Sequence, residues 1–130
     1  RAAGADAGDE GVYLAVADLL DDLFAELDPG RSRRILERLE AEERGQELFV
    51  TACAQCHTVD GVSPRTDIGP DLTHLMSRRT LAAGTLANTR GNLAGWILEP
   101  QVVKPGNRMP ATHLDPASLD ALLAYLEILE

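Results

Sequence analysis

The chain has 130 residues, a formal net charge of −9 at pH 7 and a hydrophobic content of 45%. This length suits one small domain with an appendage, and the acidic balance excludes nucleic acid as a partner. No apolar run is long enough to span a bilayer, and the first ten residues lack the apolar centre of a signal peptide. We therefore expect a mature or trimmed form, with any membrane anchor in a segment removed from its N-terminus.

The N-terminal third of the chain predicts a disordered lead, residues 1–11, followed by a helical extension, residues 12–44. Between residues 12 and 27 apolar side chains recur at steps of three and four, with acidic residues between them. This is the pattern of an amphipathic helix. Proline and glycine in Asp28-Pro29-Gly30 are expected to end it.

A second helix of the extension is expected from about Pro29 to Glu43. Its apolar stripe consists of Ile35, Leu36 and Leu39, and many arginines and glutamates surround this stripe. Pairs of opposite charge four residues apart would support its exposed face. Because an apolar stripe needs burial, we interpret residues 12–44 as a brace against the remaining domain, with partner recognition as the alternative.

Two further helices are expected to cross, one over residues 45–53 and one over residues 115–130. Gly45 and Phe49 lie one turn apart, so that a second helix can approach closely at the glycine and pack against the ring. The C-terminal segment repeats leucine at helical spacing, and Asp115 and Pro116 form a suitable N-cap and first-turn pair.

Both cysteines of the chain fall in one motif, Cys53-Ala-Gln-Cys56-His57. C-x-x-C-H is the signature of covalent haem attachment. Two thiols at this spacing reach the two vinyl groups on one edge of the porphyrin, and the histidine then lies under the iron as its proximal ligand. The alternatives are a thioredoxin-like redox pair, half of a zinc site and a structural disulfide. The sequence lacks the strand pattern of the first and the additional clustered ligands of the second.

Met109 is the candidate for the second axial ligand. A thioether on the distal face favours ferrous iron and raises the reduction potential, which suits an electron carrier. Met109 lies in the run Lys104-Pro-Gly-Asn-Arg-Met-Pro110, where two prolines and a glycine restrict the backbone. His74 and His113 are the alternative distal ligands, and we assign Met76 to core packing.

Two short helices are expected between the haem motif and the C-terminal helix, at about residues 72–81 and 92–98. No stretch shows convincing strand alternation, so the fold class is all-α. Residues 65–108 contain six basic and three acidic side chains. This window indicates either a mildly positive docking face on an acidic body or scattered solvated arginines.

The order of these motifs resembles class I monohaem cytochromes c, and most of all the cytochrome c domain fused to subunit II of haem–copper oxidases. The matching runs are Gly45-x3-Phe49, Cys53-x2-Cys56-His57, Gly69-Pro-Asp-Leu-Thr-His74, Asn92-Leu-Ala-Gly-Trp-Ile97, Pro100-Gln101 and Lys104-Pro-Gly-Asn-Arg-Met-Pro110. They cover residues 45–130 and imply a cytochrome c fold, in which crossed N- and C-terminal helices surround one haem. No cysteine remains for a copper pair, and residues 12–44 predict helices. A stand-alone soluble or tethered carrier is therefore favoured.

The resemblance also implies the site. One covalently attached haem c would have His57 and Met109 as its iron ligands. The Pro70 carbonyl would accept the ring N–H of His57 and so fix its tautomer. Trp96 resembles a buried tryptophan whose N–H lies near a haem propionate. Arg79 resembles a propionate partner, with Arg78 as its competitor.

The function that the resemblance implies is electron transfer rather than catalysis. A monomeric carrier would shuttle single electrons between a quinol-oxidising membrane complex and a terminal haem–copper oxidase. Because haem is attached to C-x-x-C-H outside the cytoplasm, we expect a periplasmic or equivalent location. The alternatives are a haem enzyme or gas sensor, such as a peroxidase with an open iron position, and a haem subunit of a larger redox complex with residues 12–44 as its docking element.

Overall fold

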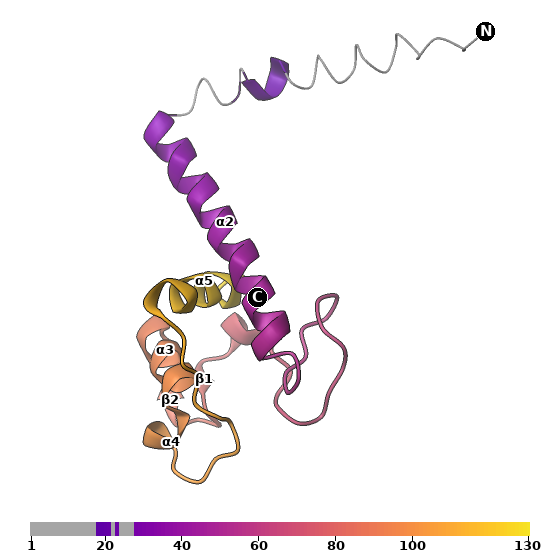
Figure 1. Ribbon diagram of the computed structural model, residues 1–130, viewed down its shortest axis with the longest axis vertical. Coiled ribbons are helices and arrows are strands. Elements are labelled where there is room, and N and C mark those ends of the chain that lie inside the picture. The colour runs from indigo at the N-terminus through magenta and orange to yellow at the C-terminus, as the bar shows by residue number, and fades with distance from the viewer. Residues whose placement is uncertain (1–17, 22, 24–27) are drawn as a thin grey trace, which may run out of the picture. The chain divides into compact units, whose positions relative to one another are not determined.

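The structure is a computed structural model that describes residues 18–21, 23 and 28–130 (Figure 1). The expected lead, residues 1–11, and most of the first expected helix lie outside the described residues. The chain divides into two compact units, Arg1–Glu37 and Arg38–Glu130. The second unit contains every residue of the site described below.

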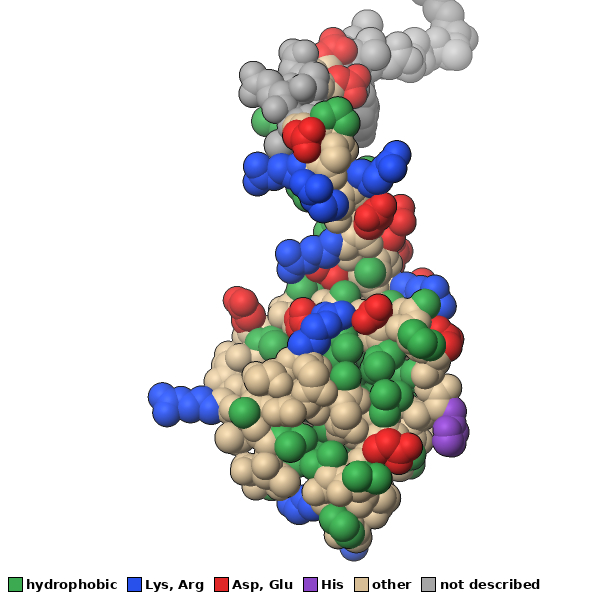
Figure 2. Space-filling model, turned by 90° about the vertical axis from the view of Figure 1, so that its left-hand side faces the viewer, with side chains coloured by type: hydrophobic (Ala, Val, Ile, Leu, Met, Phe, Trp, Pro, Cys, Tyr) green, Lys and Arg blue, Asp and Glu red, His purple; other side chains and the backbone are tan. Residues whose placement is uncertain are grey.

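Helix α2 runs without interruption from Pro29 to Ala52. The sequence predicted two helices here, with a break between Glu43 and Gly45, and this prediction is wrong. A glycine inside a helix costs only about 1 kcal/mol relative to alanine. Strong helix formers flank Gly45, and an ion pair four residues apart, Arg38 Nε to Glu42 Oε1 at 2.9 Å, supports the preceding turn. Figure 2 shows side chains of both charge signs along this helix.

Helix α5, Pro116–Leu126, crosses α2 near the C-terminal end of α2 (Figure 1). A Cβ added at Gly45 would lie 2.0 Å from the carbonyl oxygen of Ala121 and 2.7 Å from Cβ of Tyr125. One turn later Phe49 is fully buried, with its ring centroid 5.7 Å from that of Tyr125. The crossing expected from the pairing of a glycine with a phenylalanine is confirmed.

The N-terminus of α5 is capped as the sequence predicted. The side chain of Asp115 accepts a hydrogen bond from the backbone N–H of Ser118 at 2.9 Å, and Pro116 occupies the first turn. The helix ends at Leu126 instead of continuing to the last residue. The chain then closes with turns, in which the N–H of Leu129 donates to the carbonyl of Leu126 at 3.2 Å.

The helix expected over residues 72–81 is replaced by a short 3-10 turn, η1 (Leu75–Ser77), and a hairpin of β1 (Thr80–Leu81) and β2 (Leu86–Ala87). The strands are antiparallel, with Thr80 opposite Ala87. Tertiary hydrogen bonds explain the difference. The Asn88 side chain donates to the carbonyls of Leu75 at 3.0 Å and of Arg78 at 2.9 Å, which satisfies acceptors that a helix would otherwise have used.

Helix α3, Arg90–Leu98, confirms the short helix expected at about residues 92–98. Its N-cap is Thr89, whose hydroxyl accepts from the N–H of Asn92. Helix α4, Pro100–Val103, follows and begins with proline. The architecture is rich in helix, as predicted for an all-α fold. The buried core of the described residues consists of Phe49, Val59, Leu75, Leu81, Leu93, Ile97, Leu122, Leu123, Tyr125, Leu126 and Leu129.

Within the described part of the chain, no helix is both long enough and apolar enough to cross a membrane.

Candidate cofactor site

A cavity of about 550 Å³ opens inside the unit Arg38–Glu130. This volume falls within the range of cofactor and small-molecule sites, about 300–1,000 Å³. Its walls come from the end of α2, the C-x-x-C-H turn, the loop of residues 68–72, the β1–β2 hairpin, α3, α5 and residues 104–110, which we call the Met109 loop. Most of its lining is apolar, and representative side chains are Phe49, Leu72, Leu75, Leu81, Leu93 and Leu122.

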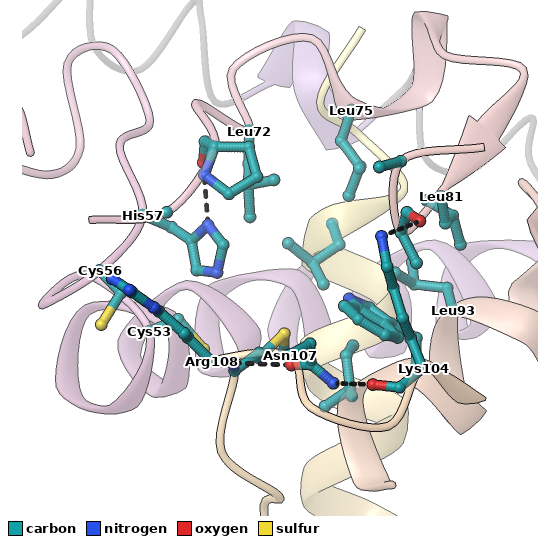
Figure 3. A pocket seen from close by; sticks show the side chains of 18 of the residues that line it. Cys53, Cys56, His57, Leu72, Leu75, Leu81, Leu93, Lys104, Asn107 and Arg108 are labelled. Atoms are coloured by element: carbon teal, nitrogen blue, oxygen red, sulfur yellow. Dashed lines mark hydrogen bonds between the residues drawn. The ribbon is translucent and has the colours of Figure 1, made fainter. Parts of the chain in front are cut away.

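The C-x-x-C-H segment forms a tight turn directly after α2. The N–H of Cys53 donates to the carbonyl of Phe49 at 2.8 Å, and the N–H of His57 donates to the carbonyl of Cys53 at 2.9 Å. Both cysteines and His57 therefore line the same cavity. Figure 3 shows the three side chains along one side of it, across from Leu81 and Leu93.

The environment of the thiols disfavours the alternative readings of the motif. Burial raises the pKa of Cys53 to about 11, and the nearby charge of Cys56 adds to this effect. A thioredoxin-like pair requires the opposite, a lowered pKa that provides thiolate at neutral pH. The two cysteines are not joined by a disulfide. Among the described residues no group of three or more His, Cys, Asp or Glu side chains is arranged to hold a metal ion.

His57 is held by the backbone of a neighbouring loop. Its Nδ1 lies 2.8 Å from the carbonyl oxygen of Pro70. A proton on Nδ1 completes this hydrogen bond and leaves the lone pair of Nε2 free to bind a metal. The structure thus contains the contact that the resemblance implies for Pro70.

Gly69 is a site residue to which the sequence analysis gave no role. A Cβ at this position would lie 2.8 Å from the carbonyl oxygen of Cys56 and 2.8 Å from Cε1 of His57. Its N–H donates to the Cys56 carbonyl at 2.6 Å. Only glycine allows the loop to approach the imidazole this closely. In the sequence, the feature that could have indicated this role is the position of Gly69 directly before Pro70, the residue whose carbonyl contacts His57.

Met109 is the only one of the proposed distal ligands that lines the cavity. Its side chain is partly buried, and its backbone N–H donates to Oδ1 of Asn107 at 2.7 Å. His74 lies outside the cavity lining, with its Nδ1 2.7 Å from the carbonyl oxygen of Glu130. His113 is exposed and also lies outside the lining.

Only some of the side chains that were expected near the haem propionates line the cavity. Trp96 lines the cavity and is partly buried, whereas Arg79 does not line it. Arg78 does, and it donates to the carbonyl of Asp71. Of the two arginines, Arg78 therefore lines the cavity, whereas the resemblance favours Arg79. The reason is local: Arg78 is extended, with φ −82° and ψ 141°, and neighbouring side chains of an extended segment point to opposite sides.

Three basic side chains, Arg78, Lys104 and Arg108, line the cavity, and no acidic side chain of the described residues does. Arg90 belongs to a different surface, because it pairs with Glu127 and, at 3.3 Å, with Asp120. The cavity therefore combines an apolar interior with a positive rim. Such a rim favours a ligand with an apolar body and an anionic edge.

Residues 42–130 match the protein-family model described as cytochrome c. Subunit 2 of the cytochrome c oxidase of Alkalihalophilus pseudofirmus is 36% identical over 104 residues, which cover 78% of this chain and 30% of that subunit. The corresponding subunit of Bacillus subtilis is 31% identical over 90 residues, 65% of this chain and 25% of that subunit. The cytochrome c of Chlamydomonas reinhardtii is 31% identical over 96 residues, which cover 65% of this chain and 85% of that protein. The chain thus spans less than a third of the oxidase subunits that it matches.

Proposed function

This chain belongs to the cytochrome c family of haem-binding electron carriers, and we propose on that basis that it is a one-electron carrier with His57 and Met109 as its axial ligands. Members of the family carry covalently attached haem c, which supplies a one-electron iron couple when bound. One observation carries the proposal. Two thiols, an imidazole held at Nδ1 and a thioether line a single cavity of about 550 Å³.

The residues of the cavity suit this role. Cys53 and Cys56 would hold the haem through thioethers. The Pro70 carbonyl holds the Nδ1 proton of His57 and so directs Nε2 toward a metal, a contact that also increases the basicity of the ligand. The apolar walls exclude water from the space between the ligands, which favours a thioether over a solvent ligand.

The positive rim and Trp96 fit the anionic edge of the haem. We propose Arg78, rather than Arg79, and the indole N–H of Trp96 as partners of the propionates. Both side chains line the cavity, and a guanidinium and an indole N–H are both hydrogen-bond donors to carboxylates.

We further propose that the electron acceptor is a terminal haem–copper oxidase and that the donor is a quinol-oxidising membrane complex. The names of the bacterial relatives, cytochrome c oxidase subunit 2, support the first part. An extracytoplasmic location, periplasmic or equivalent, follows from the compartment in which haem is attached to C-x-x-C-H. The positive rim would give a short-lived encounter that weakens with salt.

The division into a lead, residues 1–11, an extension, residues 12–44, and a haem domain, residues 45–130, remains part of this proposal. Helix α2 continues across residues 44 and 45, so the extension and the haem domain share one helix. The apolar stripe of its second expected helix is exposed, with Ile35 at 41% and Leu36 and Leu39 at 54% each, so the expected burial of this stripe is not seen among the described residues. We keep the brace as the proposed role of the extension. Deletion of residues 1–37, which form the first unit, tests it. A brace predicts lower thermal stability with an unchanged rate of electron transfer, and the opposite pattern would indicate partner recognition.

The direct test of electron transfer is stopped-flow mixing of the reduced holoprotein with a purified haem–copper oxidase. We expect rapid oxidation at low salt and a rate that falls as ionic strength rises. A high-spin ferric spectrum, together with peroxide turnover and no oxidation by the oxidase, would instead support a haem enzyme with an open iron position.

A further inference from the structure

The structure assigns a role to two amide side chains that lie in the matching runs but had no role of their own in the sequence analysis. We propose that Asn107 and Gln101 are positioning residues, which hold the Met109 loop in the conformation that places its thioether at the cavity. The inference rests on the proposed function, because it concerns how firmly Met109 competes for the iron. It goes beyond that function by naming the residues that determine how rarely Met109 would leave the iron.

The Asn107 side chain joins three backbone groups. Its Nδ2 donates to the carbonyls of Pro100 at 2.8 Å and Lys104 at 2.7 Å. Its Oδ1 accepts from the N–H of Met109 itself at 2.7 Å. One side chain thus connects Pro100, the first residue of α4, and Lys104, the C-cap of α4, to Met109. Figure 3 shows the bond between Asn107 and Lys104. The pattern fixes the orientation of the amide, because the NH₂ group faces two carbonyls and the oxygen faces an N–H.

Gln101 closes the same loop from α4. Its Nε2 donates to the carbonyl of Asn107 at 2.7 Å, and its Oε1 accepts from the N–H of Gly106 at 3.0 Å. Both ends of this amide therefore bind the backbone of residues 106 and 107. Gly106 has a φ of +84°, a conformation that glycine adopts without strain, so the turn is compatible with these bonds.

These side-chain bonds connect the loop to a firm base. Pro100 is fully buried, whereas Lys104, Pro105 and Arg108 are exposed. The exposed residues provide few core contacts. The restraint on residues 104–109 therefore includes the five hydrogen bonds of the two amides, beside the backbone bond from the Asn107 N–H to the Lys104 carbonyl and the packing of Met109 against the core. Without that restraint the loop would sample conformations in which the thioether has left the cavity.

The energetic consequence is a change in the population of the open loop. A competing ligand binds iron only when Met109 has left, so its apparent affinity increases in proportion to the fraction of open loop. Removal of the Asn107 bonds should therefore increase the open fraction about tenfold.

The experiment is a titration of the ferric holoprotein with imidazole, followed by its optical spectrum. Asn107→Ala and the nearly isosteric Asn107→Asp should each lower the apparent Kd of imidazole about tenfold. Gln101→Ala should lower it by a smaller factor. Gln101→Glu should lower it at least as much as Gln101→Ala, because a carboxylate oxygen would then face the Asn107 carbonyl oxygen that Nε2 approaches to 2.7 Å.

Asn92→Ala is the matched control. The Asn92 side chain donates one hydrogen bond, to the carbonyl of Ala87 at 3.0 Å, on a different part of the fold. Its loss should alter stability while leaving the Kd of imidazole within about twofold of the wild type. Affinities for imidazole that are equal in the Asn107 and Asn92 variants would overturn the inference.

The wild-type spectrum tests the proposed ligation, and the imidazole titration of the variants tests the positioning role, so that the two claims can fail separately. A wild-type protein without the weak red-edge band of methionine on ferric iron would contradict ligation by Met109. A wild-type protein with that band, whose Asn107 variants bind imidazole no more tightly, contradicts only the positioning role. If the Asn107 variants fail to fold, deuterium exchange of the Met109 amide in Gln101→Glu gives the answer. Faster exchange than in the wild type supports the inference, and an equal rate overturns it.

Discussion

His57 Nδ1 lies 2.8 Å from the carbonyl oxygen of Pro70, and this close approach requires a residue without a Cβ at position 69. A backbone carbonyl cannot be removed by changing a side chain. The preceding glycine can be changed, and it provides the means to disturb the imidazole without replacing it.

Gly69→Ala should displace either the loop or the ring of His57. The added Cβ would stand 2.8 Å from Cε1 of the ring and 2.8 Å from the Cys56 carbonyl oxygen, which is closer than van der Waals contact allows. Overpacking of this kind costs roughly 1–3 kcal/mol. We expect a corresponding loss in the free energy of unfolding, measured with guanidinium chloride. Gly95→Ala is the control, since nothing lies within 4 Å of its added Cβ, and it should be neutral or stabilising.

Gly45→Ala should separate the crossing helices α2 and α5. Its Cβ would lie 2.0 Å from the Ala121 carbonyl oxygen, and neither atom belongs to a flexible side chain that could move aside. We expect a loss of about 3 kcal/mol or more, measured by thermal and denaturant unfolding. Gly91→Ala has open space around its Cβ and is the matched control. Equal stabilities of the two variants would contradict a close crossing at Gly45.

The N-cap of α5 predicts a pH dependence of stability. Hydrogen bonds from the backbone N–H and the hydroxyl of Ser118 lower the pKa of Asp115. A carboxyl whose pKa is lower in the folded state stabilises the protein above its unfolded pKa, and this contribution disappears as the pH falls through the folded pKa. The melting temperature of the wild type should therefore exceed that of Asp115→Ala at neutral pH, and this difference in melting temperature should decrease in acid. A difference that stays constant down to pH values below the ordinary aspartate range would contradict stabilisation by a charged cap.

The two neighbouring arginines should differ in their effect on the reduction potential. Removal of a cation from the cavity rim disfavours the reduced state, because reduction adds negative charge at the site. Arg78→Ala should lower the potential, by on the order of 30 mV, as measured by redox titration. Arg79→Ala should leave it nearly unchanged. The reverse order would restore Arg79 as the propionate partner.

The parts of the site that were predicted from sequence depend on local spacing. Cys53, Cys56 and His57 share one turn, and their chemistry requires no knowledge of distant contacts. Met109 was identified because a thioether stands in a run stiffened by proline and glycine. The cap at Asp115 and the close approach at Gly45 follow from side-chain size and hydrogen-bonding capacity. Both properties are known from the residue types alone.

The parts that were missed depend on tertiary contacts. The segment 72–81 was expected to be helical, but the side chain of Asn88 binds its carbonyls and stabilises a turn and a hairpin. The resemblance favours Arg79 over Arg78 as the propionate partner. The direction of each side chain depends on the extended backbone at Arg78, which the predicted helix over residues 72–81 does not contain. The roles of Asn107 and Gln101 depend on hydrogen bonds with five backbone groups, and no sequence pattern specifies these bonds.

The central claim is that His57 and Met109 together bind the iron of a covalently attached haem. The most direct measurement is the optical spectrum and reduction potential of the ferric holoprotein, compared with those of Met109→Ala and of the control His113→Ala. We expect the red-edge methionine band in the wild type and in His113→Ala. Met109→Ala should lose the band and show a lower potential. A band that persists in Met109→Ala, or that the wild type never shows, would contradict the account.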